Sequence, residues 1–241
     1  MRIDVLTLFP EMFPPIFGAS ILGRAAQSGI VNYHVHDIRE WAGNKHNKVD
    51  DRPFGGGPGM VMMCQPVYDG VLAVEALDPR PAMRIVMSPQ GEPLRQRRVD
   101  WLAKQERLLL IAGHYEGIDE RVIEELSPLE LSVGDYVLSG GELAAMLVVD
   151  SVVRLLPGAL GHESSAAEDS FASSDVSEGG SPGPAMGLLD CPHFTRPREW
   201  RGRIVPDVLL SGDHASIAQW RNQQRLERTR QRRPDLFASD P

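Results

Sequence analysis

Apolar residues in the first two thirds of the chain form short continuous runs, separated by stretches with helical spacing. Continuous runs bounded by Gly or Pro are typical of parallel strands that are covered on both faces. Three such runs lie at residues 84–87, 108–112 and 129–133, and residues 2–8 and 30–37 predict two further strands. Helices are predicted at residues 16–28, 67–77, 94–105, 119–126 and 140–156. This order predicts an α/β domain with a parallel sheet.

A glycine-containing loop follows each of the three central runs, at residues 88–91, 113–117 and 134–142. In open α/β sheets, ligands bind at the carboxyl ends of the strands. Glycine permits close approach, so exposed backbone N–H and C=O groups can contact a purine edge. One such loop is more often an ordinary turn, but three in series favour a single pocket with a backbone-rich lining.

Residues 40–60 are too polar and too rich in glycine for a regular element, and they include the run 55–59. No Lys-Ser/Thr follows this run, which excludes a phosphate-binding P-loop. A long loop inside a compact domain is usually functional or disordered. Two interpretations stay open, a flexible hinge and a backbone cradle for a nucleotide beside Asp50, Asp51 and Arg52.

The predicted helix at residues 140–156 is apolar nearly all round, which predicts burial. Its polar exceptions, Asp150 and Arg154, are spaced i, i+4. An ion pair on the solvent side is the favoured interpretation of this spacing. The alternative is that Arg154 points into a site.

Composition changes at residue 161. Residues 161–190 contain seven Ser, five Gly, two Pro and six acidic residues, with no Lys or Arg, so they cannot bury enough apolar surface to fold alone. They predict a flexible acidic linker or lid, whose titratable candidates are His162, Glu163, Glu168 and Asp169. The expected organisation is an α/β domain at 1–160, this linker at 161–190 and a C-terminal domain at 191–241.

The net charge of −8 argues against a nucleic-acid partner, but the charge is unevenly distributed. Residues 1–192 carry a net charge of −12, whereas residues 193–233 carry ten Arg and a net charge of +6. Asp213 can cap a helix at 214–232 that Pro234 ends. Arginines spaced four, three and four apart form one stripe on this helix, which favours phosphate contacts: Arg221, Arg225, Arg228 and Arg232.

Other features exclude several classes of protein. No apolar run approaches the roughly 18 residues that a membrane helix needs, and residues 1–9 predict a first strand, not a signal peptide. The two cysteines, Cys64 and Cys191, lack the spacing of metal ligands. We therefore expect a reduced, cytoplasmic protein without structural zinc.

Eight motifs occur in order along nearly the whole chain, and together they resemble the bacterial tRNA (guanine-N1)-methyltransferase family of the SPOUT class. They are DDRPFGGGPGM (50–60), SPQG (88–91), GHYEGIDER (113–121), SVGDYVLSGGE (132–142), PG (157–158), EDSF (168–171), LLDCPHFTRP (188–197) and VLLSG (208–212).

The resemblance implies a parallel sheet with a deep trefoil knot, a small, mainly helical C-terminal domain and a homodimer with shared active sites. It implies methyl transfer from S-adenosylmethionine to N1 of the guanine immediately 3′ of the tRNA anticodon, which maintains the reading frame. It also implies dependence on Mg²⁺, with Glu116 as a candidate ligand. Two alternatives stay open, a SPOUT methyltransferase for another RNA and a non-catalytic RNA-binding protein of this fold.

Matching positions carry the site residues that the resemblance implies. Asp169 matches the general base, Arg154 matches the residue that stabilises charge on the guanine, and the loop that encloses the target base matches Asp50, Gly55, Gly56, Gly57, Pro58 and Gly59. The residues implied to bind the cofactor are Ser88, Pro89, Gly113, Tyr115, Glu116, Gly117, Val133, Gly134, Asp135, Tyr136, Val137, Leu138, Gly140 and Gly141.

The sequence departs from the family in an insertion at residues 172–186. Since loop insertions cost little free energy, we expect activity to survive.

Overall fold

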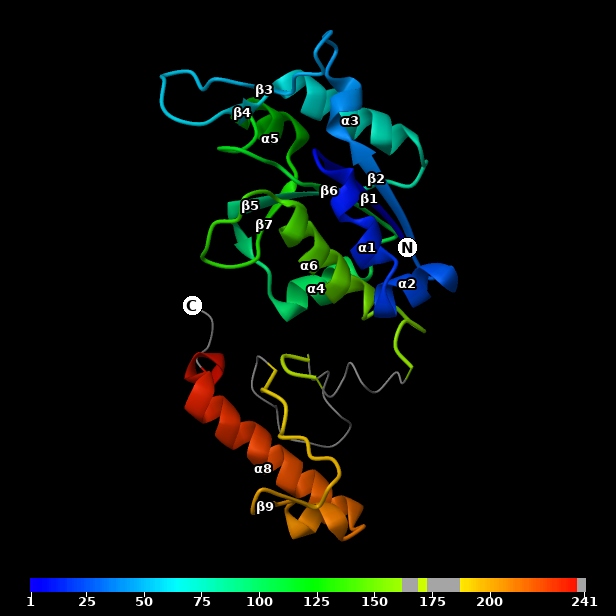
Figure 1. The fold of residues 1–241 in the computed structure, drawn as a ribbon, viewed down its shortest axis with the longest axis vertical. Helices are drawn as coiled ribbons and strands as arrows, with labels where there is room; N and C mark the ends of the chain where they lie inside the picture. The colour runs from blue at the N-terminus through cyan, green and yellow to red at the C-terminus, as the bar shows by residue number, and fades with distance from the viewer. Residues whose placement is uncertain (162–168, 173–186, 238–241) are drawn as a thin grey trace. The chain divides into compact units, whose positions relative to one another are not determined.

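The structure is a computed structural model that describes residues 1–161, 169–172 and 187–237 (Figure 1). Its contacts divide the chain into two compact units, Met1–His162 and Glu163–Pro241. The expected linker at 161–190 and the insertion at 172–186 fall mostly outside the described residues. Within the described part of the chain, no helix is long and apolar enough to cross a membrane.

A five-stranded sheet forms the centre of the first unit, with strand order β2-β1-β6-β5-β7 and every neighbouring pair parallel. The predicted parallel sheet is thus confirmed. Its strands are β1 (Arg2–Thr7), β2 (Asn32–Asp37), β5 (Met83–Pro93), β6 (Arg107–Ile111) and β7 (Leu129–Ser132).

Helices cover both faces of this sheet, because alternate residues of each strand point to opposite faces (Figure 1). In β6, Leu108 and Leu110 face the core shared with α2, α4 and α6, while Leu109 and Ile111 face the core shared with α3 and α5. The helices are α1 (Pro14–Phe17), α2 (Ser20–Gln27), α3 (Cys64–Ala76), α4 (Gln96–Leu102), α5 (Glu120–Leu126) and α6 (Glu142–Val153). Short 3₁₀ helices lie at Pro10–Met12 and Ile38–Trp41.

The predicted helix at 16–28 is wrong in one respect, because it is two helices, α1 and α2. The break lies at Ala19, whose backbone is extended with φ −105° and ψ 156°. Just after it, Gly23 packs against Gly18 so closely that a Cβ atom on Gly23 would lie 2.3 Å from the Gly18 carbonyl oxygen.

The prediction that the third strand ends at Met87 is also wrong. β5 runs on to Pro93 and pairs with β7 twice, before and after a register shift between Met87 and Glu92. Residues 88–91 are thus a bulge within one strand, a device that re-aims a chain next to a site. A Cβ atom on Gly91 would lie 2.4 Å from the Glu130 carbonyl carbon, so only glycine fits there.

Helix α6 is only partly buried, which corrects the prediction of a fully buried helix. Val148, Val149 and Val152 are fully buried, but Leu143 and Leu147 are 52% and 51% exposed. These two leucines are four residues apart and share one face of the helix. The first unit therefore presents an apolar face on α6.

The second unit is mainly helical in its described part. It contains the hairpin of β8 (Glu199–Trp200) and β9 (Arg203–Ile204), 3₁₀ helices at Asp207–Leu210 and Pro234–Phe237, and the long helix α8 (His214–Arg232). The predicted cap is confirmed, because the Asp213 carboxylate accepts hydrogen bonds from the backbone N–H groups of Ala215 and Ser216 at 3.0 and 3.3 Å.

Candidate active site

A pocket of about 410 Å³ lies at the bulge of β5 and the carboxyl ends of β6 and β7, where the three glycine-containing segments meet. A second hollow of about 520 Å³ lies at the amino ends of β5 and β7, between residues 78–84 and 126–129. Only the first has the backbone-rich lining expected for a nucleotide-like ligand. We therefore take it as the candidate active site.

The structure brings together all but one of the residues expected to bind the cofactor, and the exception is Asp135. Lining residues that the sequence did not single out include Gln90, His114, Ile118 and Ser139. They lie beside expected residues in the same loops. The expected set that lines the pocket is Ser88, Pro89, Gly113, Tyr115, Glu116, Gly117, Val133, Gly134, Tyr136, Val137, Leu138, Gly140 and Gly141.

Two of the loops touch backbone to backbone at Gly141. Its N–H donates to the carbonyl of Gly113 at 2.7 Å. A Cβ atom on Gly141 would lie 2.8 Å from Ala112 Cα and 3.0 Å from Gly113 N. Because both neighbours are main-chain atoms, they cannot rotate away. Any side chain at this position must move one wall of the pocket.

A buried carboxylate also joins these loops, and sequence analysis assigned it no role. Glu142 is 2% exposed, accepts a hydrogen bond from Thr7 Oγ1 at 2.7 Å and hydrogen-bonds to His114 Nε2 at 2.9 Å. Buried carboxylates require such partners. The sequence feature that could have indicated this role was an acidic residue, Glu142, at the start of an otherwise apolar helix. Glu142 therefore holds β1, the second loop and α6 together under the pocket.

The glycine-rich loop lies next to this pocket. It connects β3 (Asp50–Asp51) to β4 (Val61–Met62) in a short antiparallel hairpin, so residues 40–60 do contain a regular element, contrary to expectation. The hairpin joins the second pocket loop, since Glu116 N donates to Met60 O at 3.0 Å and Met62 N to Gly117 O at 2.9 Å. Positive φ angles, which favour glycine, occur at Gly55, Gly56, Gly57 and Gly59.

Arg154 lies at the other end of α6 from the pocket. Gly141 precedes the helix and Arg154 is its C-terminal capping residue. A 12-residue α-helix is roughly 18 Å long at 1.5 Å per residue. The side chain of Arg154 is half-buried, but it does not line this pocket within one chain.

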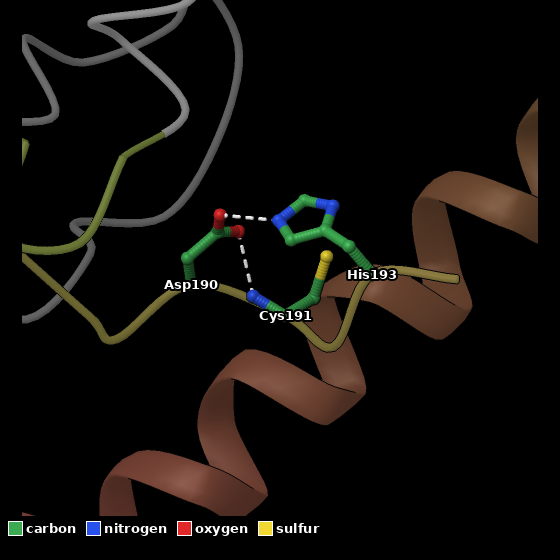
Figure 2. A group of neighbouring side chains, drawn as sticks. All are labelled: Asp190, Cys191 and His193. Atoms are coloured by element: carbon green, nitrogen blue, oxygen red, sulfur yellow. Dashed lines mark hydrogen bonds and ion pairs between the residues drawn. The ribbon is translucent and has the colours of Figure 1, made fainter. Parts of the chain in front are cut away.

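Asp169 belongs to the second unit and lies in a turn at residues 169–172. Its carbonyl oxygen accepts a hydrogen bond from Ala172 N at 3.2 Å. The turn contacts a segment that contains Asp190, whose carboxylate hydrogen-bonds to His193 Nε2 at 2.7 Å and accepts from Cys191 N at 2.6 Å (Figure 2).

The expected arginine stripe is only partly exposed. Arg221 and Arg232, at its ends, are exposed. The two central arginines face Asp190 instead, with Arg225 Nη2 at 3.3 Å from its carboxylate and Arg228 Nη1 at 3.5 Å from its carbonyl oxygen. The stripe includes part of the buried face of α8, which the spacing of the charges alone does not reveal.

No dedicated magnesium cage is formed around Glu116 by the described residues. Within residues 1–161, 169–172 and 187–237, the group of three potential ligands that lie close together is Asp190, Cys191 and His193, which does not include Glu116. Mg²⁺ usually keeps several waters and binds through one or two carboxylates together with substrate oxygens. Glu116 alone does not define such a site.

The fold and pocket define an α/β protein with a pocket suited to a nucleotide-like ligand beside its parallel sheet. The sequence profile of the family described as "tRNA (Guanine-1)-methyltransferase TrmD" matches residues 1–239. The chain belongs to this family.

Similar proteins include three that are each named "tRNA (guanine-N(1)-)-methyltransferase". The one from Shouchella clausii is 53% identical over 237 residues, which are 98% of this chain and 91% of that protein. The one from Ruminiclostridium cellulolyticum is 51% identical over 242 residues, covering 100% and 98%. The one from Bacillus subtilis is 51% identical over 244 residues, covering 100% and 94%.

A Gly141→Ala substitution is expected to weaken binding of S-adenosylmethionine by about tenfold or more, equivalent to about 1.4 kcal/mol. The added methyl group would press on main-chain atoms of the second loop. Isothermal titration calorimetry measures the change. Gly161→Ala is the matched control, because a Cβ atom there has no neighbour within 4 Å among the residues that the structure describes. Equal affinities for the two variants would show that this loop contact does not shape the pocket.

Proposed function

We propose that this chain transfers a methyl group from S-adenosylmethionine to N1 of the guanine immediately 3′ of the tRNA anticodon, and so maintains the reading frame. Membership of the family makes it a tRNA guanine-N1 methyltransferase that uses S-adenosylmethionine. The observation that supports the proposal most is the contact between a backbone-lined pocket and a glycine-rich loop, at Glu116–Met60 and Gly117–Met62. The backbone-lined pocket suits the cofactor, and the glycine-rich loop suits the target base.

The pocket fits the cofactor because glycines leave its main-chain groups accessible and Gly141 permits the close contact of two loops. When bound, S-adenosylmethionine supplies an electrophilic methyl group on a sulfonium. In this proposal the bulge at 88–91 and the loops at 113–117 and 133–141 hold and orient it. Holding two reactants in line can account for much of the rate acceleration.

Asp169 and Arg154 supply the acid–base chemistry of the proposal. N1 of a neutral guanine carries a proton and is a poor nucleophile. As its lone pair forms the bond to the methyl carbon and the carbon–sulfur bond breaks, the Asp169 carboxylate takes the N1 proton. Negative charge that develops on O6 is stabilised by the Arg154 guanidinium. The target base must leave its stack to reach the pocket, and the loop around Gly55–Gly59 would enclose it.

The proposed active site requires two chains. Arg154 is separated from the pocket by the length of α6, roughly 18 Å, so one chain does not offer both to one guanine. A two-fold dimer in which the exposed leucines of α6 meet would place the Arg154 end of one helix near the pocket end of the other. Leu143 and Leu147 supply the apolar face for this contact.

A complementation experiment tests the shared site. Arg154→Ala keeps an intact pocket, while Gly141→Val keeps Arg154 but obstructs the pocket, so each variant alone is expected to be inactive. After unfolding and refolding together, about half of the dimers are mixed and each has one complete site, which restores about a quarter of wild-type activity. Two copies of one variant refolded together are the control. No activity in the mixture would show that Arg154 and the pocket act within one chain.

Three further features belong to this proposal. The trefoil knot is one of them, at the place where the loop after edge strand β7 lies against the loop after β6 through the Gly141–Gly113 hydrogen bond. The exposed Arg221 and Arg232 suit phosphate contacts with tRNA. A cytoplasmic location suits the two free cysteines, Cys64 and Cys191. Mg²⁺ enters no step, since Glu116 belongs to no group of three potential ligands among the described residues.

A further inference from the structure

The turn that carries Asp169 is hydrogen-bonded to a segment further along the chain. Phe171 N donates to Leu188 O at 3.0 Å, and Asp190 N donates to Ser170 Oγ at 2.9 Å. These two contacts are made by Ser170 and Phe171, the first and second residues after Asp169. The position of the turn within the second unit therefore depends on where Leu188 and Asp190 lie.

Helix α8 in turn holds that segment. Leu189 N donates to Thr229 Oγ1 at 3.0 Å, and the Thr229 hydroxyl donates to Arg225 O at 2.7 Å. Thr229 is fully buried, so its hydroxyl needs these partners. Asp190 adds an ion pair with Arg225 at 3.3 Å. A further contact comes from Arg233, whose guanidinium carbon lies 5.6 Å from the centre of the Phe171 ring.

The Asp190 carboxylate is already engaged, which favours a structural role over metal binding. Its two oxygens are hydrogen-bonded to His193 Nε2 and Cys191 N (Figure 2). Arg225 brings a positive charge to the same carboxylate. A cation would have to displace these partners. Burial also raises the pKa of the Cys191 thiol, whereas a metal requires the thiolate.

We propose that Ser170, Asp190 and Thr229 are positioning residues for the methyl-transfer step. They fix the turn that carries Asp169 onto α8, so that the carboxylate is held ready for the N1 proton. The inference rests on the proposed function, in which Asp169 is the general base. Proton transfer needs hydrogen-bond distance, and a displacement of about 1 Å can cost on the order of 10²-fold in rate.

The same contacts explain how the chain accommodates the insertion. The described chain stops at Ala172 and continues at Gly187, and a Cβ atom on Gly187 would lie 2.4 Å from the Ala172 carbonyl oxygen. Ala172 and Gly187 are therefore neighbours. Because the Phe171–Leu188 and Ser170–Asp190 hydrogen bonds lie outside the insertion, they fix the turn at Asp169 independently of its length.

Steady-state kinetics of Ser170→Ala and Asp190→Asn test the proposal. We expect kcat to fall about 10- to 100-fold. The KM for tRNA and the affinity for S-adenosylmethionine should stay within about twofold of wild type, because the described residues that line the cofactor pocket lie between Val86 and Ala144. Asp207→Asn is the matched control. This substitution also removes a carboxylate that pairs with an arginine of the second unit, Arg198, but the Asp207 side chain is 86% exposed. The kcat of the Asp207→Asn variant should therefore equal that of the wild type.

A double-mutant cycle separates positioning from a general loss of structure. If Ser170 and Asp190 act through Asp169, their substitutions should cause no further loss in an Asp169→Ala background. An equal loss in both backgrounds, or no loss in wild type, would overturn the positioning role and leave the proposed function standing. Full turnover by Asp169→Ala would instead remove the proposed base.

Two measurements keep the test decisive. Circular dichroism reports whether Asp190→Asn still folds, and if it does not, Ser170→Ala carries the test, because it removes only one half-buried hydroxyl. Equilibrium dialysis with Zn²⁺ checks the competing role of the Asp190 cluster. Stoichiometric binding that His193→Gln abolishes would make this cluster a metal site and overturn its assignment as a tether.

Discussion

Replacing Asp169 with alanine is expected to lower kcat for methyl transfer by about 10²–10⁴-fold, the usual contribution of a general base. The guanine N1 proton would then have no positioned acceptor. Binding of S-adenosylmethionine should be nearly unchanged, since Asp169 is not among the residues that line the pocket. Single-turnover kinetics with saturating tRNA measures the chemical step, and calorimetry measures the affinity for the cofactor.

A matched control strengthens this test. Asp207→Ala, which removes an exposed carboxylate of the second unit, serves as the control. Turnover by Asp169→Ala within about twofold of the control would exclude Asp169 as the base.

The largest effect on stability is expected from Asp4→Ala, at about 3–5 kcal/mol of unfolding free energy. Asp4 and Arg107 form an ion pair at 3.0 Å in which both side chains are fully buried. Arg107 also donates hydrogen bonds to carbonyl oxygens at the end of α3, including Val74 at 2.6 Å and Glu75 at 2.9 Å. Removing the carboxylate leaves a buried charge without its counter-ion.

Denaturant unfolding measures this loss. Glu92→Ala is the control, because Glu92 also pairs with an arginine, Arg98, but is 42% exposed. Exposed pairs typically contribute about 0–1 kcal/mol. A loss for Asp4→Ala no greater than that of the control would show that Arg107 is satisfied by the carbonyl groups alone.

The Asp4 network also predicts how stability depends on pH. Burial alone would raise the pKa of Asp4, but hydrogen bonds from His36, Arg2 and Arg107 outweigh it and hold the pKa well below its usual range. A carboxylate with a depressed pKa in the folded state stabilises the protein above its unfolded value of about 3.9 and loses this contribution as the pH falls below it. In the Asp4→Ala variant, the free energy of unfolding should therefore decrease less steeply than in the wild type as the pH falls into the acidic range.

Periodicity and turn residues predicted most of the first unit, because its strands are continuous apolar runs and glycine marks where they end. The errors arose where tertiary contacts override local pattern. Gly91 allows β5 to resume pairing after the bulge, and no local signal distinguishes a bulge from a loop. Leu143 and Leu147 show the same limit of sequence prediction. An apolar residue type does not reveal whether the side chain is buried within its own chain or exposed on its surface.

Within the candidate site, the motifs predicted the pocket lining but not its supports. Glu142 and Thr7 are 135 residues apart and meet under the pocket at 2.7 Å. Arg225 and Asp190 are 35 residues apart and pair within the second unit. Such contacts depend on how elements pack and leave no local signal in the sequence. The arginine stripe, whose spacing suggested phosphate binding, therefore also contains Arg225, which pairs with Asp190 and helps to hold the Asp169 turn.

Methylation of N1 of the guanine immediately 3′ of the anticodon is tested most directly by transfer of a labelled methyl group from S-adenosylmethionine to two tRNA transcripts. The transcripts differ only at that position, one with guanine and one with adenine. We expect label on the guanine transcript alone. Equal labelling of both transcripts, or no labelling of either while cofactor binding is intact, would contradict it.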